Sequence, residues 1–217
     1  QCGPGVPSLP DDLSFRGLHG YDGHHRSHER SAAHTSYDSL VQLARTLELQ
    51  PAHTVITSGT HSYEHALVHG GLSEGPWQQE VSPGTIVLSD LRSAHAADAL
   101  SLRQAVFVAS RVVSVGEGRV TLDAGSKALN PDVRPPHCAL LGWPELEVGS
   151  PSEEHLPVWG PTDAMPALGE LVWIVPAHAC TTVNLYQEAL YVRDGTYAGA
   201  GTIDAAGHPL WIEGHRE

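Results

Sequence analysis

The most informative short motif of the chain is His178-Ala179-Cys180, which joins an imidazole and a thiol with one residue between them. The motif lies in the run from Trp173 to Leu185, which we take as extended at the motif itself. Side chains at positions i and i+2 of a strand point to the same face, so His178 and Cys180 can close on one ion. Nitrogen and sulfur donors together favour zinc over magnesium or calcium. The alternative is a hydrogen-bonded core histidine beside a small buried cysteine.

A second candidate is the loop Thr57-Ser58-Gly59-Thr60, which follows a strand predicted over 53–57. Small residues at the carboxyl end of a strand offer backbone N–H groups and hydroxyls to an anion, and a following helix adds its positive end. The loop therefore predicts a phosphate site. An ordinary strand-to-helix turn with Ser or Thr as the N-cap explains the same pattern.

The turn-rich segment 20–24 follows another predicted strand, over 13–18. It brings Tyr21 and His24 to the same rim as the loop 57–60. The alternative is a buried tyrosine beside a capped histidine.

Two further segments carry groups that can do chemistry. Lys127, the only lysine, lies beside Asp123, and a desolvated amine is a nucleophile for Schiff-base chemistry. The alternative is an ion-paired loop residue. The segment Ser152–His155 offers two carboxylates and an imidazole, which suit a general base or a further metal ligand, or a solvated helix start.

Composition excludes several classes of protein. The chain has 217 residues with 41% apolar and 17% charged side chains, which suits a soluble globular protein. No apolar run reaches the ~18 residues of a membrane span, and no secretory leader is recognisable. Three cysteines, Cys2, Cys138 and Cys180, make an odd, sparse set that favours a reducing compartment, so we expect the cytoplasm. A net charge of −13 without a basic cluster argues against nucleic acid binding.

The order of predicted elements indicates two kinds of structure. Leu40, Leu43, Ala44 and Leu47 form the apolar stripe of a helix over 36–49, ended by Pro51. With the flanking strands and a short helix over 63–68, this α/β order favours a parallel barrel or a doubly wound sheet. After the turn at 82–84 the pattern is mostly β. Strands are predicted over 85–88, 105–115, 119–122, 171–175, 183–185, 189–192 and 197–203, with hairpin turns at 116–118 and 193–195.

Taken in order, these motifs resemble the D-threonine aldolase and D-serine dehydratase-like family, which are pyridoxal-phosphate enzymes of alanine-racemase-like architecture. The motifs that carry the resemblance are Phe15–His24, Thr57–Thr60, Glu80–Thr85, Asp123–Leu129, Ser152–His155 and His178–Leu185. The resemblance implies that residues 1–82 are the last part of a cofactor-binding parallel β/α barrel, and that residues 83–217 are a β-rich, β-barrel-like metal-binding domain.

The resemblance also implies site residues. Ser58, Gly59 and Thr60 would hold the phosphate of pyridoxal 5'-phosphate, and Tyr21 and His24 would line the cofactor pocket. His178 and Cys180 match the family's metal-ligand pair; zinc with these two residue types is similar to the dehydratase branch, whereas the aldolase branch often has an acid at the position of Cys180.

Lys127 does not match the family's Schiff-base lysine, which belongs near the start of the barrel. We therefore expect another ~150 residues upstream of Gln1, close to the size of a domain.

The expected activity is β-elimination from a β-hydroxy D-amino acid such as D-serine, giving a keto acid and ammonia. The first alternative is a retro-aldol cleavage to glycine and an aldehyde, as in D-threonine aldolase. The second is a non-catalytic metal-binding fragment that lacks the Schiff-base lysine. The expected partner is a small D-amino acid substrate, without nucleic acid or membrane, and relatives imply a homodimer.

Overall fold

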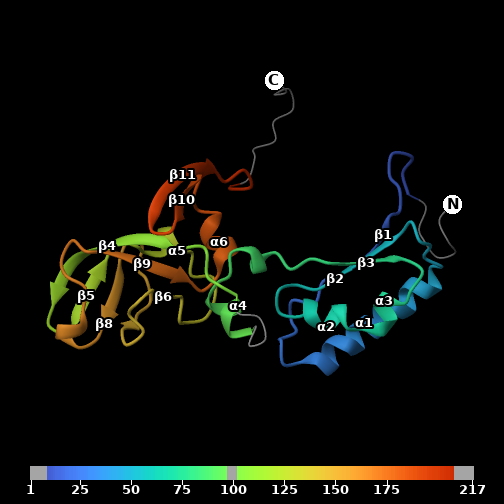
Figure 1. Cartoon of the computed structure of the whole chain (residues 1–217), viewed down its shortest axis with the longest axis horizontal. Helices are drawn as coiled ribbons and strands as arrows, with labels where there is room; N and C mark the ends of the chain where they lie inside the picture. The colour runs from blue at the N-terminus through green and yellow to red at the C-terminus, as the bar shows by residue number, and fades with distance from the viewer. Residues whose placement is uncertain (1–8, 97–101, 208–217) are drawn as a thin grey trace, which may run out of the picture. The chain divides into compact units, whose positions relative to one another are not determined.

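The computed structural model of the chain describes residues 9–96 and 102–207 (Figure 1). These residues form two compact units. The first runs to Val87 and includes 93–96 and 102–103, whereas the second contains 88–92 and 104–207. In the described residues, no helix is long and apolar enough to cross a membrane. Cys138 and Cys180 are thiols, and Cys2 lies outside the described ranges.

The first unit contains a three-stranded parallel sheet with its helices beside it (Figure 1). Its elements are β1 (Gly17–Gly20), α1 (Arg30–Thr46), β2 (Thr54–Thr57), α2 (Tyr63–Leu67), α3 (Gly70–Ser73), β3 (Gln78–Val81) and a 3-10 turn (Thr85–Val87). The strand order is β1-β2-β3, and β2 is parallel to both neighbours. All three strands therefore end at the same edge of the sheet. This alternation agrees with the α/β order expected from the sequence.

Helix α1 confirms the predicted stripe except at Leu43: Ala44 is buried, and Leu40 and Leu47 pack partly buried against the core. Its buried side chains are Ala33, Tyr37, Val41 and Ala44, whereas Leu43 is 45% exposed. The helix begins at Arg30, six positions before the predicted start at 36, so its inner face is centred on Tyr37. The prediction for Leu43 was wrong because this position lies about 120° around the helix from Tyr37, away from the buried face.

Helix α1 also ends earlier than predicted, and Pro51 does not end it. Glu48 has a left-handed φ of 52°, its N–H donates to Arg45 O at 3.0 Å, and Leu49 N–H donates to Ala44 O at 3.1 Å. This is the hydrogen-bond pattern of a Schellman motif, and Leu49 and Ala44, both buried, supply its apolar contact.

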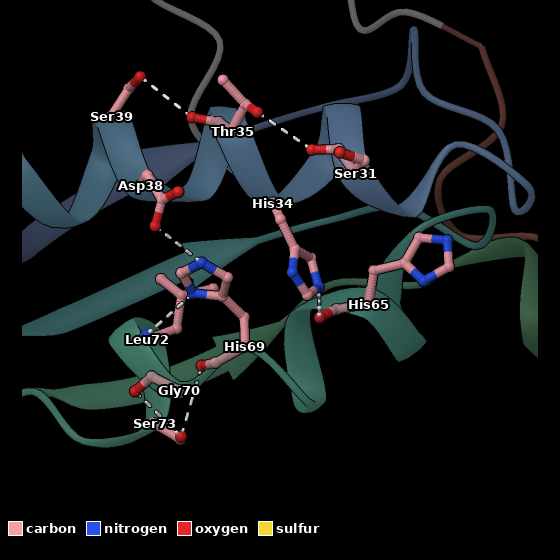
Figure 2. Close-up of polar contacts among 10 residues, drawn as sticks. All are labelled: Ser31, His34, Thr35, Asp38, Ser39, His65, His69, Gly70, Leu72 and Ser73. Carbon is pink, nitrogen blue, oxygen red and sulfur yellow. Dashed lines mark hydrogen bonds and ion pairs between the residues drawn. The ribbon is translucent and has the colours of Figure 1, made fainter.

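Three histidines join α1 to the two short helices, as Figure 2 shows. His34 Nε2 lies 3.2 Å from His65 O, and His69 Nε2 lies 3.1 Å from Asp38 Oδ1. His69 Nδ1 accepts the N–H of Leu72 at 3.2 Å and so caps α3. The ring of His65 turns away from the other two (Figure 2), and its Nε2 lies 2.7 Å from a backbone carbonyl. These imidazoles hold helices together, and in the described residues no group of three His, Cys, Asp or Glu side chains could hold a metal.

The contact between α1 and α2 should weaken in acid. Burial, followed by the positive charge of neighbouring His69, lowers the pKa of His34 below its ordinary value of 6.5. The folded state therefore binds this proton less readily than the unfolded state. Its contribution to stability is complete above the unfolded pKa and is lost as pH falls through the lower folded pKa. We expect His34→Gln, which keeps a donor for the carbonyl of His65, to reduce this loss.

Urea unfolding of the full chain, followed by far-UV circular dichroism at about pH 7.5 and about pH 5.5, tests this expectation. The midpoint of the native chain should fall more between the two pH values than that of His34→Gln. Equal falls would contradict a role for His34.

The second unit is built on a six-stranded antiparallel sheet in the order β6-β9-β4-β5-β8-β7. Its strands are β4 (Val108–Gly116), β5 (Arg119–Leu122), β6 (Cys138–Leu140), β7 (Glu147–Val148), β8 (Leu156–Trp159) and β9 (Leu171–Pro176). The edge strands β6 and β7 also approach each other, so the sheet is nearly closed into a barrel. The remaining elements are α5 (Ser126–Leu129), a 3-10 turn (Thr162–Ala164), α6 (Ala179–Val183) and the hairpin β10 (Glu188–Arg193) and β11 (Thr196–Thr202), while α4 (Leu91–Ala96) contains residues of both units.

Alternating side chains fill this sheet. On β5, Val120 and Leu122 are fully buried, and they lie opposite Val158 and Leu156 of β8, which are also fully buried. Such cross-strand pairs are the unit of sheet stability. The prediction of a β-rich second part is confirmed.

The two predicted hairpins are confirmed, and two predicted strands are wrong. Gly116 lies opposite Arg119 at the first turn, and Asp194 and Gly195 both have positive φ, 51° and 75°, at the second. A two-residue turn of that kind matches the twist of antiparallel strands. The predicted strand over 85–88 is instead a 3-10 turn, and that over 183–185 contains the end of α6. Runs this short do not distinguish strand from helix by their pattern alone.

Candidate functional site

The residues predicted to bind a phosphate follow β2 at the carboxyl edge of the parallel sheet. Ser58 is fully buried and has a left-handed φ of 71°. Gly59 O accepts backbone N–H groups from Ser62 at 3.2 Å and Tyr63 at 3.1 Å. From the end of the neighbouring β3, Ser82 Oγ donates to Ser58 O at 2.8 Å. Hydrogen bonds from the start of α2 and from the residue after β3 thus hold the loop. The contact of Ser82 with the loop was not predicted from the sequence.

A buried polar network lies beneath this loop. Asp22 is 3% exposed, and its two carboxylate oxygens accept the hydroxyls of Tyr37 at 2.6 Å and Ser62 at 2.7 Å. Tyr37 Oη also lies 3.2 Å from Ser58 Oγ. Burial, and then the hydrogen bond to Asp22, raises the pKa of Tyr37 to about 12, so the phenol is neutral at physiological pH. The hydroxyl of Ser58 is therefore part of the interior network.

Tyr21 and His24 lie on the segment after β1, at the same edge. Tyr21 is 70% exposed, and its ring packs so closely on Gly23 and Gly59 that a β-carbon would lie 2.5 Å from Cε1 at position 23 and 3.3 Å from Cε2 at position 59. The alternative of a buried tyrosine is wrong. His24 is exposed, and its ring packs at a tilt against buried His25, with ring centroids 4.0 Å apart. The fold therefore brings Tyr21 to the predicted phosphate loop, as the sequence analysis expected.

His178 and Cys180 do not lie on a strand. The strand β9 ends at Pro176, His178 has extended φ and ψ of −134° and 104°, and α6 begins at Ala179. Buried Asp90 accepts the first N–H of α6, from Ala179, at 2.9 Å. The expectation of an extended chain through Cys180 is wrong, because this carboxylate supplies an acceptor for a helix start, which a pattern of apolar residues does not reveal.

The helix start still brings the two side chains together. His178 Nδ1 lies 2.7 Å from Asp132 Oδ2. The hydrogen bond of the imidazole with Cys180, and after it the hydrogen bond with Asp132, raises the pKa of His178 to about 9. The His178 side chain is 25% exposed and Cys180 is exposed, so the pair faces solvent. The alternative of a buried core pair is wrong.

Lys127 and the paired glutamates engage one another. Lys127 Nζ lies 2.6 Å from Glu153 and 2.8 Å from Glu154. These hydrogen bonds, that of Glu153 first, raise the pKa of Lys127, which is the opposite of what an amine nucleophile requires. The prediction of an ion-paired lysine is confirmed, and the two carboxylates form a surface ion pair instead of offering a base.

Comparisons with known proteins show what the chain is similar to. Residues 105–192 match the family model described as "Putative serine dehydratase domain". The chain is 30% identical over 206 residues to D-threonine aldolase from an Arthrobacter species, which covers 90% of this chain and 52% of the aldolase. The crystal structure of D-threonine aldolase from Filomicrobium marinum superposes with a TM-score of 0.72 at 27% identity, covering 85% of this chain and 52% of that one. The chain is therefore similar to D-threonine aldolases over most of its length, and to the serine dehydratase domain over residues 105–192.

D-threo-3-hydroxyaspartate dehydratase from Delftia sp. HT23 has the same fold, with a TM-score of 0.63 at 19% identity over 88% of this chain and 56% of that one. These named relatives are enzymes that act on hydroxy amino acids. The chain spans about half the length of the aldolases that it matches.

The two candidate sites in this chain each include a residue that sequence reasoning missed. Asp132 lies 46 positions before His178, and Tyr37 lies in the middle of α1, 15 positions after Asp22. A carboxylate after a predicted turn is the only local signal for Asp132, and Tyr37 shows no signal beyond its place one turn before Val41.

Proposed function

We propose that this chain is the carboxyl-terminal portion of a pyridoxal-phosphate- and zinc-dependent lyase that acts on β-hydroxy D-amino acids. The proposed reaction is the β-elimination of a D-serine-like substrate to a keto acid and ammonia. The observation that carries the proposal is the solvent-facing pair of His178 and Cys180, with Asp132 bonded to Nδ1 of the imidazole.

The donor set fits zinc. One imidazole nitrogen and one thiolate are ligands that zinc accepts at once, and a site with only two protein ligands leaves positions open to substrate. Among the solved structures of D-threo-3-hydroxyaspartate dehydratase are a His-to-Ala variant and a Cys-to-Ala variant in a metal-free form, and the two replaced residues are two positions apart, with one residue between them. That spacing is the spacing of His178 and Cys180 here.

The loop after β2 fits the phosphate of the cofactor. Its residues are small, the left-handed Ser58 turns the chain sharply, and the network beneath holds the loop rigid. The exposed ring of Tyr21 beside Gly59 suits a neighbouring flat ring. We assign Ser58, Gly59 and Thr60 to the phosphate, and Tyr21 and His24 to the cofactor pocket. Lys127 does not fit a covalent anchor, because two glutamates hold it as a cation.

Each bound group supplies one kind of chemistry. Pyridoxal phosphate withdraws electrons from the α-carbon of an amino acid, and zinc, as a Lewis acid, makes a hydroxyl a better leaving group by several kcal/mol. The chain's own residues position these groups. His178 and Cys180 would hold the metal, and the network of Asp22, Tyr37 and Ser58 would keep the phosphate loop in place.

The second candidate function is the retro-aldol cleavage of a D-threonine-like substrate, which the 30% identity to an aldolase favours. Steady-state assays of the full-length protein on D-serine and on D-threonine separate the two. We expect equal amounts of ammonia and keto acid from D-serine. Glycine and aldehyde from D-threonine, without ammonia from D-serine, would replace the proposal with the aldolase.

If the protein retains zinc, shows no cofactor absorbance in the near-visible range and turns over neither substrate, it is a non-catalytic metal-binding protein. Metal analysis and an absorbance spectrum of the full-length protein identify it. The homodimer and the cytoplasmic location remain predictions, and light scattering after gel filtration tests the first of them.

A further inference from the structure

The carboxylate of Asp132 is held at both of its oxygens. Oδ2 lies 2.7 Å from His178 Nδ1, and Oδ1 accepts the hydroxyl of Thr181 at 3.0 Å. Because Thr181 lies on α6, directly after Cys180, the carboxylate bridges two residues that flank the thiol. The imidazole cannot turn about its ring axis without losing its bond to a carboxylate that is itself fixed.

The segment that carries Asp132 is tied to the same helix. Asn130 ends α5 with a left-handed φ of 42°, and the N–H of Asp132 donates to Asn130 O at 2.8 Å. From α6, Thr182 Oγ1 donates to Leu129 O at 2.8 Å, and Asn130 Nδ2 donates to Thr181 O at 3.4 Å. The position of Asp132 relative to His178 is therefore set by several bonds between the loop after α5 and the first turn of α6.

We propose that Asp132 is the positioning residue of the zinc site: it accepts the Nδ1–H of His178 and so presents Nε2 to the metal, beside Cys180. A neutral imidazole that carries its proton on Nδ1 has its lone pair on Nε2. Carboxylates behind metal-binding histidines fix both the tautomer and the ring orientation, and they make the ligand nitrogen more basic. The inference deepens the proposed function and rests on its zinc site.

The geometry favours this role over direct coordination by Asp132. Both of its oxygens already have protein partners, and one of these partners is the ring of His178 itself. In the part of the chain that the structure describes, no third His, Cys, Asp or Glu completes a metal-binding group with the pair. Asp132 therefore acts through His178.

Zinc affinity of the full chain, measured by competition with a chromogenic chelator, is the first test. Asp132→Ala should weaken zinc binding about 10- to 100-fold, and Asp132→Asn should weaken it by about 10-fold, because an amide oxygen keeps the hydrogen bond without the charge. The control is Asp163→Asn, an exposed carboxylate on the 3-10 turn of the same unit, which should leave the affinity unchanged. Hydrogen exchange of α6 verifies that each variant is folded. If Asp132→Ala does not fold, Asp132→Asn provides the test.

Nitrogen NMR of the histidine rings in the zinc-loaded chain is the second test, since a merely structural role would not change a tautomer. We expect a proton on Nδ1 and the metal on Nε2 of His178, and a mixed tautomer in metal-free Asp132→Ala. If the metal binds Nδ1 of His178, the inference about Asp132 is wrong. It is also wrong if folded Asp132→Ala keeps native zinc affinity and this affinity still depends on His178. Either result leaves the zinc site of the proposed function intact. A native chain that binds no zinc overturns the zinc site of the proposed function as well.

Discussion

Alanine in place of His178 or Cys180 is expected to weaken zinc binding by more than about 100-fold, beyond the loss expected for residues behind the ligands. Each variant leaves one protein ligand, and a single imidazole or thiolate cannot hold the ion against water. The fold should be retained, because both side chains face solvent and the bonds that begin α6 come from backbone groups and Asp90. Metal content after dialysis against a weak chelator is the measurement.

The matched control is the thiol of Cys138, in the same unit. Cys138 is 1% exposed, and burial raises its pKa to about 12, so it stays a neutral thiol, which is a poor ligand. Cys138→Ala should keep full zinc binding and lose about 1 kcal/mol of stability from the missing buried sulfur. Native zinc content in folded His178→Ala and Cys180→Ala would show that the metal pair is assigned wrongly.

Asp22→Ala should lower the stability of the first unit by about 3 kcal/mol, because two buried hydroxyls lose a charged acceptor. Those hydroxyls belong to Tyr37 on α1 and Ser62 beside the phosphate loop, so one substitution releases two elements together. Against a typical stability of 5–15 kcal/mol, roughly, this is a large share. Tyr37→Phe removes one of the two bonds and should cost about 1.5 kcal/mol.

Hydrogen exchange followed by mass spectrometry on the full chain resolves this effect locally. Peptides from α1 and from the loop 57–62 should exchange faster in Asp22→Ala, whereas peptides from β5 and β8 should not change, because those strands lie in the other unit. The exposed carboxylate of Asp12 offers a control, and Asp12→Ala should exchange like the native chain. Unchanged protection in Asp22→Ala would mean that the carboxylate does not hold the loop.

Some strands and turns of this protein could be predicted from the sequence because they depend on local chemistry. Strand β5 has the predicted bounds, and the turn at Asp194 and Gly195 forms as expected, because two or three residues decide such features. The pairing of His178 with Cys180 was also predicted, although from an extended backbone where the structure has a helix start. Residues two apart can meet both in a strand and at the start of a helix, so the chemistry of the pair survived an error about its secondary structure.

Sequence by itself determined which groups are available: one imidazole beside one thiol, small residues after β2, and a single lysine. Only the tertiary structure decided which of them act together. Asp132 reaches His178 across 46 positions, Asp22 reaches Ser62 across 40, and Lys127 forms ion pairs with glutamates that lie 26 and 27 positions later. The physical reason is that such bonds form only when packing has brought distant segments within about 3 Å, and no local pattern records that distance.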